Sequence, residues 1–405
     1  MLRAILEVIN ALNGFRPLSR NGYVSFVVFH FGWPTSELPM LYLAASVLDV
    51  LRRGKRGDFK GRRGFAALAA TSASWVVLAA IRRRVVASGP LLQDSLREEL
   101  GSDYLDKVNT LPAAPSPTGR PSAWRTPIAR RRYVDKQDTV RYGPHGRANL
   151  ADIWRRRDLP RDGKAPVVVQ VPGGGWAIGM RRPQAYPLMS HLADRGWICV
   201  SLSYRVSPRH TWPDHIVDVK RALWWVRENI ASFGGDPDFV AITGGSAGGH
   251  LASLAALTPN DRAFQPGFED ADTSVVAAVP LYGRYDWVST KGNGRRGFVA
   301  FLEKFVVKRP LGDHRDIYID ASPIRRTRAD APPFFIVHGH DDSIIPVGEA
   351  REFVAAMRDV SKSPVVYAEL LHTQHGFDIF GSARAHHTAE AVGQFLSWVY
   401  AARGG

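Results

Sequence analysis

The pattern of apolar and polar positions divides the chain into two parts. From about residue 133 onward, short runs rich in β-branched residues alternate with longer segments whose apolar residues recur at helical spacing. Several runs are apolar throughout, which is typical of parallel strands covered on both faces. The pattern predicts one α/β domain with a doubly wound, mostly parallel sheet. The predicted strands are Ala148–Trp154, Pro166–Val171, Ile198–Ser203, Val240–Thr243, Val275–Pro280, Phe334–His338 and Val365–Leu370, and the predicted helices include Pro213–Phe233, Gly248–Leu257, Val347–Asp359 and Ala385–Ala402.

The first 90 residues follow a different pattern. Apolar residues at helical spacing from Leu2 to Leu12 predict a short amphipathic helix that ends near Asn13-Gly14. Three apolar runs follow, and the last and longest of them is free of charged residues. Its 17 residues reach the lower limit for a helix that spans a hydrocarbon core of ~30 Å. The three runs are Tyr23–Trp33, Leu38–Leu51 and Phe65–Ile81.

Positive charge is concentrated in the same part of the chain. The formal net charge is +15, and residues 1–90 hold 13 Lys and Arg against 4 Asp and Glu. Basic residues beside apolar runs favour anionic lipid headgroups over a nucleic acid, for which no binding motif is present. We therefore expect membrane association through residues 1–90, with a small soluble helical subdomain as the alternative. The basic loop Arg52–Arg63 and the arginines Arg82–Arg84 predict opposite orientations in a membrane, so the orientation stays open.

The segment that joins the two parts differs from both in pattern and composition. Residues 91–109 have the pattern of an amphipathic surface helix, and Leu111–Pro127 contains five prolines among Ser, Thr and Gly. Such a composition is typical of an extended linker. We therefore predict a surface helix and linker at residues 91–130 and the α/β domain at residues 131–405.

Composition limits the classes of protein that remain. With 45% hydrophobic and 22% charged residues, the chain can bury a large core, which excludes a disordered or collagen-like protein. The single cysteine, Cys199, excludes an intramolecular disulfide and a cysteine-based metal cage. Nothing in the pattern indicates the oligomeric state.

Chemistry is indicated first at the end of a predicted strand. The strand Val240–Thr243 is followed by Gly244-x-Ser246-x-Gly248 and then by a predicted helix. This is the pattern of a nucleophile elbow, where a serine sits on a sharp turn between strand and helix. The glycines leave room for close packing, and the helix N-terminus directs N–H groups at the reacting centre. A glycine-rich structural turn is the alternative, whereas a phosphate loop would need a G-K-[ST] ending that is missing.

A second glycine-rich loop follows the strand Pro166–Val171. Its three consecutive glycines, Gly173 to Gly175, let backbone N–H groups converge on one point, as an oxyanion hole requires. A flexible loop is the alternative. The position of the loop after a strand and upstream of the elbow favours the oxyanion hole.

A serine nucleophile needs a general base, and the base needs an acid that orients it. His375 lies after the last predicted strand, and Gly376 beside it permits a tight turn. His372, three residues earlier, is the alternative base. The preceding predicted strand ends close to Asp341 and Asp342, either of which is a candidate acid. The chain order of serine, aspartate and histidine is the one expected for an elbow on this type of sheet.

The same segments offer an alternative metal site. His338, His340 and Asp342, together with His372 and His375, are ligand types for a hydrolytic zinc ion. Such a site would need neither the elbow nor the triple glycine. We therefore expect no metal.

These motifs occur in the order and spacing of a known family. Residues 140–400 resemble α/β-hydrolase esterases of the hormone-sensitive-lipase and acetyl-esterase type, through the segments PVVVQVPGGGW, ITGGSAGGHLA, FFIVHGHDDSIIPV and HGF. The resemblance implies the α/β-hydrolase fold and no metal or organic cofactor. The basic, apolar N-terminal extension is similar to that of actinobacterial, mycobacterial-type members of the cell envelope. It implies a membrane-associated or cell-envelope location in a bacterium.

The resemblance also implies a role for each site residue. It makes Ser246 the nucleophile, His375 the general base and Asp342 the acid. The oxyanion donors that it implies are the backbone N–H groups of Gly174, Gly175 and Ala247.

One position departs from the family pattern. Pro172 stands where the family usually has the histidine of a His-Gly-Gly-Gly motif. Proline has neither an N–H group nor a side-chain donor, so the loop must be braced in another way.

The sequence therefore predicts a serine carboxylester hydrolase that works through an acyl-enzyme on a small-molecule or lipid ester. An acyltransferase with the same residues is the alternative. The insertion Tyr282–Ala321, which is rich in aromatic residues and arginines, is either a lid over the site or a helical packing insert.

Overall fold

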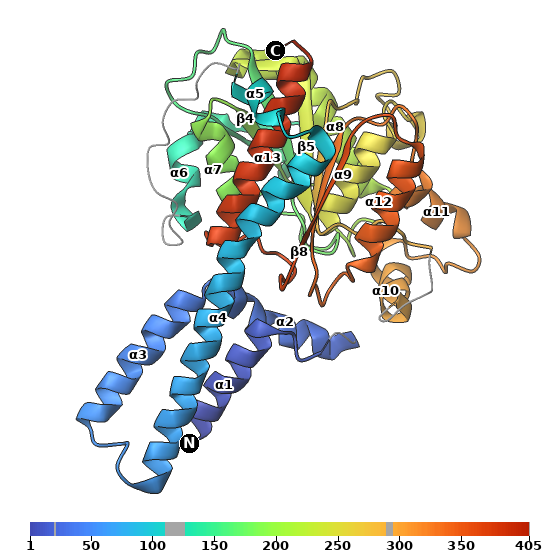
Figure 1. Ribbon diagram of the computed structural model, residues 1–405. Helices are drawn as coiled ribbons and strands as arrows, with labels where there is room; N and C mark the ends of the chain where they lie inside the picture. Colours follow the sequence, from blue (N-terminus) through green and yellow to red (C-terminus); the bar gives the residue numbers. More distant parts are fainter. Residues whose placement is uncertain (20–21, 110–125, 289–294, 405) are drawn as a thin grey trace.

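The computed structural model describes residues 1–19, 22–109, 126–288 and 295–404 (Figure 1). Its central sheet consists of β1 (Thr139–Arg141), β2 (Leu150–Trp154), β3 (Ala165–Val171), β4 (Ile198–Leu202), β5 (Gly235–Gly245), β6 (Ala278–Leu281), β7 (Phe334–Gly339) and β8 (Val365–Leu370). The strand order is β1-β2-β4-β3-β5-β6-β7-β8. Strands β3 to β8 run parallel, while β2 pairs antiparallel with both β1 and β4. The predicted doubly wound, mostly parallel sheet is confirmed; only the three-residue β1 has no counterpart among the predicted strands.

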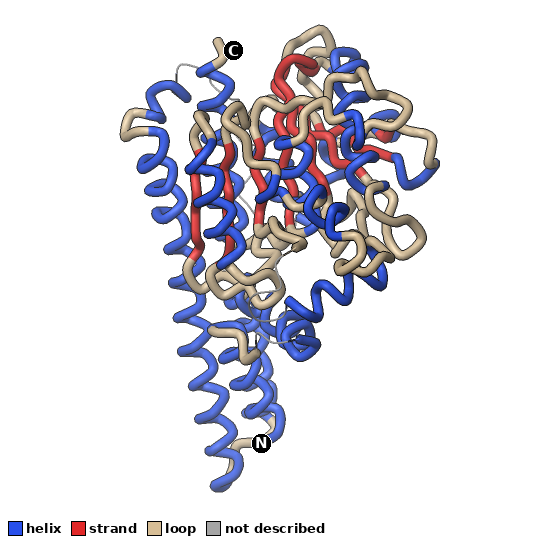
Figure 2. Tube along the Cα trace, turned by 90° about the vertical axis from the view of Figure 1, so that its right-hand side faces the viewer, coloured by secondary structure: helices blue, strands red, loops and turns tan. Residues whose placement is uncertain are grey.

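Helices cover both faces of the sheet (Figures 1 and 2). Along β3, Val167, Val169 and Val171 pack into one core and Val168 into the other, because successive side chains of a strand point to opposite faces. The first core includes side chains of α8 (Asp214–Asn229), α9 (Ala247–Leu257) and α12 (Gly348–Val360), and the second includes side chains of α7 (Tyr186–Asp194) and α13 (Ala383–Ala402).

One helix, α4 (Gly61–Leu100), is continuous over 40 residues. We expected a boundary near residue 90 and a separate surface helix at 91–109. In the structure, residue 90 lies inside α4, and the short helix α5 (Tyr104–Asn109) follows. The arginines at 82–84 do not end the helix, because arginine is a strong helix former. Most of the predicted linker lies outside the described residues.

The last turns of α4 belong to the α/β domain. Leu92, Leu96 and Leu100 are buried in the second core, whereas Asp94, Arg97 and Glu98 are exposed, so residues 91–100 have the amphipathic pattern predicted for a surface helix. Its Glu99 accepts a hydrogen bond of 2.9 Å from the backbone N–H of Val365 on the edge strand β8. The helix therefore joins the N-terminal region to the sheet without a flexible break.

The N-terminal region is a bundle of helices that projects from the α/β domain (Figure 1). The predicted amphipathic helix is α1 (Leu2–Phe15), and the first two apolar runs form α2 (Gly22–Glu37) and α3 (Pro39–Lys55). The third apolar run forms the first part of α4.

Small and polar side chains line much of the interior of this bundle, and many large apolar side chains lie outside. Leu78, Ile81 and Val85 of α4 also pack inside the bundle, against Ala11 of α1. On α4, Phe65 and Val76 are each 71% exposed. The buried stripe of the same segment is Gly64, Ala67, Thr71 and Ser74. On α1, the exposed residues are Leu2, Ile5, Leu6, Ile9 and Leu12, whereas Ala4, Ala11 and Asn13 are buried.

Polar side chains inside the bundle are paired with one another. Ser46 on α3 donates to Glu7 on α1 at 3.1 Å, and the indole N–H of Trp75 on α4 donates to the Ser46 hydroxyl at 2.9 Å. Buried polar pairs together with exposed apolar residues also occur in helices packed within lipid. Among the described helices, α4 is the one that is long and apolar enough to cross a membrane.

Candidate active site

The candidate nucleophile lies at the turn between β5 and α9. Ser246 follows the last residue of β5 and precedes the first residue of α9, and its backbone has φ +57° and ψ −122°. A positive φ is rare for a residue with a side chain and is associated with functional sites. This strand–turn–helix conformation is the one predicted for a nucleophile elbow.

Glycine is required on both sides of Ser246 by close backbone contacts. A Cβ atom on Gly244 would lie 2.5 Å from the carbonyl oxygen of Gly248, and one on Gly248 would lie 2.1 Å from the carbonyl oxygen of Val171. Both distances are shorter than any tolerated contact, so α9 packs on β5 and β3 only with glycine at these positions.

The candidate base and acid are hydrogen-bonded to each other. Nδ1 of His375 donates to Oδ2 of Asp342 over 2.6 Å, and both residues are buried. The other carboxylate oxygen, Oδ1, accepts the backbone N–H groups of Ile344 and Ile345 at 2.8 and 2.7 Å. Burial raises the pKa of Asp342, but the charges and hydrogen bonds of His375 and His338 outweigh it and hold the pKa well below its usual range. The carboxylate is therefore ionised beside His375.

The two alternative residues pair with each other instead. Nδ1 of His372 lies 3.7 Å from Oδ2 of Asp341, and the His372 side chain is exposed. Only Asp342 and His375 thus form a buried pair.

Gln374 ties the loop of the base to the loop of the acid. Its side-chain oxygen accepts the backbone N–H groups of Ser343 and His375, each at 2.8 Å. Its amide donates to the Ser343 hydroxyl at 2.9 Å. This glutamine lies outside the motifs identified in the sequence, because its partner Ser343 is 31 residues away and leaves no local pattern.

Tyr282 packs against His375 and lies beside the backbone that precedes Ser246. Its ring centroid is 4.6 Å from that of His375, and a Cβ on Gly245 would lie 2.4 Å from its hydroxyl oxygen. The hydroxyl donates to the buried carboxylate of Asp378. Tyr282 is thus a neighbour of both the elbow and the candidate base, and within the described residues no hydrogen bond joins the Ser246 hydroxyl to the His375 ring.

The triple-glycine loop packs directly on the serine. A Cβ on Gly173 would lie 3.2 Å from the Cβ of Ser246. The N–H of Gly173 donates to the side-chain oxygen of Gln184 at 2.7 Å, and the Gln184 amide donates to the Gly173 carbonyl at 3.3 Å. The hydroxyl of Tyr204 donates to the carbonyl of Pro172 at 3.0 Å. These contacts brace the loop where Pro172 replaces the family histidine, and they leave Gly174, Gly175 and Ala247 as the candidate oxyanion donors.

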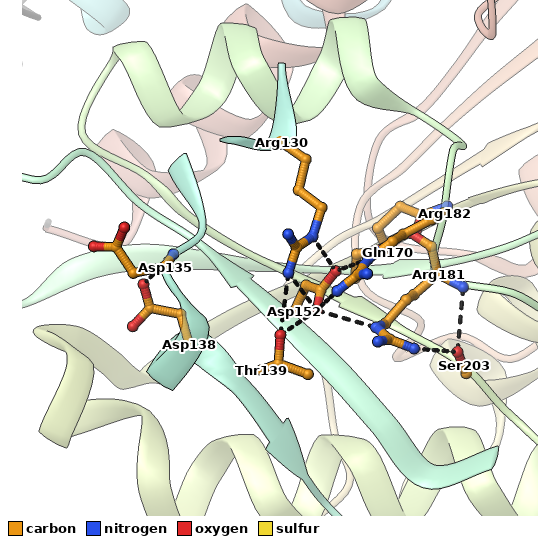
Figure 3. A network of polar contacts seen from close by, with 10 residues as sticks. Arg130, Asp135, Asp138, Thr139, Asp152, Gln170, Arg181, Arg182 and Ser203 are labelled. Atoms are coloured by element: carbon orange, nitrogen blue, oxygen red, sulfur yellow. Dashed lines mark hydrogen bonds and ion pairs between the residues drawn. The ribbon is translucent and has the colours of Figure 1, made fainter. Parts of the chain in front are cut away.

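A buried carboxylate anchors the continuation of this loop to the sheet (Figure 3). Asp152 on β2 accepts hydrogen bonds from Arg181 at 3.0 Å and from Arg182, and from Arg130 at 2.7 Å. Burial raises the pKa of Asp152, but these hydrogen bonds and charges lower it far more. The network holds both arginines two to three residues before Gln184, which fixes the position of that glutamine.

The aromatic insertion packs in the core and also reaches the candidate oxyanion loop. Tyr285 and Trp287 are fully buried in the first core, as expected of a packing insert. In α10 (Arg295–Phe301), Phe301 lies 3.8 Å from the position of a Cβ on Gly175, beside the candidate oxyanion loop. The insertion thus supports the core and also contacts the candidate site.

The alternative zinc ligands are engaged in other contacts. His338 donates to the Ile345 carbonyl at 2.9 Å, and His340 contacts Glu369 at 2.7 Å. His375 is hydrogen-bonded to Asp342. In the part of the chain that the structure describes, no group of three or more His, Cys, Asp and Glu side chains is arranged to hold a metal ion.

The sheet order and the elbow at the end of β5 define an α/β-hydrolase. The model of the BD-FAE family matches residues 153–357. Probable carboxylic ester hydrolase LipM of Mycobacterium tuberculosis is 50% identical over 393 residues, which cover 96% of this chain and 90% of that relative. Esterase LipQ of the same organism is 45% identical over 92% of this chain and 85% of its own length.

Solved structures agree with this assignment. The butyrate-bound form of the Thermogutta terrifontis esterase Est2 superposes with a TM-score of 0.54 and 25% identity, over 66% of this chain and 94% of the esterase. Esterase 2 of that organism phosphonylated by sarin has a TM-score of 0.56 and 26% identity, over 64% and 93%. The chain belongs to the BD-FAE family of α/β-hydrolase esterases and is an enzyme of the carboxylic ester hydrolase class.

Proposed function

We propose that this chain hydrolyses carboxylic esters through an acyl-enzyme formed on Ser246. His375 takes the proton of the Ser246 hydroxyl as it attacks the acyl carbon, and Asp342 fixes the imidazole tautomer and stabilises the imidazolium. The N–H groups of Gly174, Gly175 and Ala247 bind the oxyanion, and each such donor is worth roughly 3–4 kcal/mol in comparable sites. The ester C–O bond then breaks, and the His375 imidazolium gives its proton to the leaving alcohol. A water molecule activated by His375 finally releases the acid and restores the serine.

The observation that carries this proposal is the buried hydrogen bond between His375 and Asp342. It is accompanied by the strained backbone turn of Ser246, which lies on a separate loop. A catalytic hydrogen bond between nucleophile and base commonly tightens only when substrate is bound, so its absence here does not weigh against the mechanism. The family and the named relatives support the same reaction.

The test uses 4-nitrophenyl butyrate, because a solved relative binds butyrate. Ser246→Ala should lose at least a thousand-fold in kcat while the circular dichroism spectrum is unchanged. An organophosphonate should label the wild type at Ser246 and leave the variant unlabelled, and a chelator should leave the rate unchanged. Retained turnover in Ser246→Ala would rule out the serine mechanism.

We further propose that residues 1–90 associate with a membrane of the bacterial cell envelope. The supporting observation is the inverted bundle, with Gly64, Ala67, Thr71 and Ser74 inside and large apolar residues outside. After cell fractionation, the protein should stay in the membrane pellet through an alkaline carbonate wash and be released by detergent. Release by carbonate alone would contradict membrane insertion and favour a soluble helical bundle.

A further inference from the structure

Helix α2 has two opposite faces with different surroundings. Val24, Val27 and Phe31 follow one another at spacings of three and four residues, so they lie on one face of the helix, and each is more than half exposed. Phe29, Trp33 and Glu37, spaced by four residues, form the opposite face and pack against the α/β domain.

The packed face of α2 contacts the loop that carries the candidate base. The ring of Phe29 stands edge-on to His375, with 6.0 Å between centroids. The indole N–H of Trp33 donates to the carbonyl of Gly376 at 2.9 Å, and its ring lies 4.5 Å from that of Phe380. The helix therefore forms a wall beside His375, although the two are more than 340 residues apart in the chain.

A buried ion pair fixes the end of α2 to the same region. Glu37 pairs with Arg384 at the start of α13 and accepts a hydrogen bond of 2.8 Å from Ser382. All three side chains are buried. The exposed face of α2 therefore keeps a constant position relative to His375.

The exposed face of α2 continues into the apolar outside of the N-terminal bundle. Figure 1 shows α2 running out from the top of the bundle, below the loops of the α/β domain. Exposed basic residues lie at the same level: Arg16 follows α1, and Arg82 and Arg83 follow the apolar stretch of α4. The end of α1 lies beside these arginines of α4, because Arg84 donates a hydrogen bond to the carbonyl of Phe15. A belt of arginine next to an apolar surface is complementary to anionic headgroups above acyl chains.

We propose that α2 lies in the plane of the membrane–water interface, with Val24, Val27 and Phe31 among the acyl chains, and that it presents the Ser246–His375 site to esters dissolved in the bilayer. This inference rests on the proposed function and names its substrate class: a lipid-soluble ester whose ester group reaches the interface while its hydrocarbon part stays in the membrane. An exposed apolar face with arginine at the same level can bind both the acyl chains and the anionic headgroups of a membrane.

The first test compares two substrates on the full chain reconstituted in phosphatidylglycerol–phosphatidylcholine vesicles. The variant Val24→Ser/Val27→Ser/Phe31→Ser removes the apolar face of α2 and leaves Phe29 and Trp33 intact. Hydrolysis of water-soluble 4-nitrophenyl butyrate should stay within two-fold of wild type, whereas hydrolysis of a long-chain diacylglycerol in the vesicles should fall at least ten-fold.

The matched control is Ile128→Ser/Ile319→Ser/Val360→Ser, which removes three exposed aliphatic side chains of the α/β domain. It should leave both rates unchanged. Unchanged diacylglycerol hydrolysis in the α2 variant, or an equal fall for both substrates, would overturn the inference while the esterase function stands. A wild-type chain that hydrolyses neither ester would overturn the proposed function itself, and the inference with it.

The second test measures depth in the membrane without activity. The chain has one cysteine, Cys199, which is fully buried, so Phe31→Cys can be labelled selectively with a fluorescent dye. Lipids brominated along the acyl chain should quench this label and leave a label at Val360→Cys unquenched. Absence of quenching at position 31 would show that water or a protein partner covers this face and would overturn the inference.

Discussion

The side chain of Gln184 makes two hydrogen bonds to the backbone of Gly173, one to its N–H and one to its carbonyl. Gly173 is also in contact with Ser246. One glutamine thus links the candidate oxyanion loop to the nucleophile, at the position where the family histidine is replaced by Pro172.

Gln184→Leu should lower kcat for 4-nitrophenyl butyrate about ten- to hundred-fold with a small change in KM. The loop keeps its glycines but loses its brace, and a misplacement of about 1 Å in an active site costs up to ~100-fold. Steady-state kinetics check this, with circular dichroism as the control for folding. A kcat within two-fold of wild type would show that Tyr204 and the Asp152 network hold the loop without Gln184.

Asp342→Asn should lower kcat about 10⁴-fold, because an amide favours the wrong tautomer of the neighbouring imidazole. Asp341→Asn is the matched control and should change kcat less than five-fold, since Asp341 faces the exposed His372. The same comparison applies to the histidines, where His375→Gln should be inactive and His372→Gln active. Equal losses in the two aspartate variants would contradict the assignment of the acid.

Gly248→Ala should both destabilise and inactivate the enzyme. The new methyl group would lie 2.1 Å from the carbonyl oxygen of Val171, so α9 must move away from β3 and take Ser246 with it. Overpacking of this kind costs about 1–3 kcal/mol in the free energy of unfolding.

Gly312→Ala is the control for this change, because nothing lies within 4 Å of the new methyl group. Thermal denaturation and turnover should be those of the wild type. A Gly248→Ala variant that melts and turns over like Gly312→Ala would show that the backbone around the elbow relaxes freely.

Glu37→Gln should lower the stability of the contact between α2 and α13. The substitution leaves the Arg384 guanidinium buried without its counter-charge, and breaking a buried pair in this way costs about 3–5 kcal/mol. Thermal melting in detergent measures the effect, and Glu37→Met/Arg384→Met should recover part of the loss. Asp270→Asn, which breaks the exposed pair with Arg262, is the control and should leave the melting temperature almost unchanged.

Stability should decrease as the pH falls below about 6.5. Burial lowers the pKa of His250 to about 3 in the folded protein, while an unfolded histidine titrates near ~6.5. Between these values the unfolded state binds a proton that the folded state does not, so the free energy of unfolding decreases as the pH is lowered. His250→Gln keeps groups that can pair with Trp176 and Ala321. Its free energy of unfolding should fall less steeply as the pH is lowered, because the variant takes up about one proton fewer per molecule on unfolding. Urea titrations at several pH values give the free energy of unfolding of both proteins. The same dependence of this free energy on pH in both would contradict the prediction.

The sequence predicted those parts of the site that strand ends determine. Parallel strands bring their carboxyl ends to one edge, so motifs placed after strands led to Ser246, to His375 and to the neighbouring Asp341 and Asp342, between which the family resemblance favoured Asp342. Gln184 and Gln374 were missed because each acts on backbone groups of another loop, which leaves no periodicity or motif. The contact of α2 with His375 was missed for the same reason, since it joins opposite ends of the chain.

The N-terminal region shows a different limit of sequence analysis. Spacing of apolar residues predicted helices there, but spacing alone does not decide which face packs inward. The structure turns the small and polar residues inward, as the buried Ala4 and the exposed Leu2 of α1 illustrate. The continuity of α4 was also missed, because the change of pattern after residue 90 suggested a break that the helix does not have.

Because α4 is unbroken, its length sets the rotation of the α/β domain relative to the N-terminal bundle. An α-helix turns about 100° and rises about 1.5 Å per residue, so two extra residues between Arg84 and Leu92 would rotate the sheet by about 200° against the bundle. Phe29 and Trp33 would then face away from the loop that they now support. The number of residues in this one helix, and not only their identity, therefore determines how the reactive centre is oriented relative to the bundle.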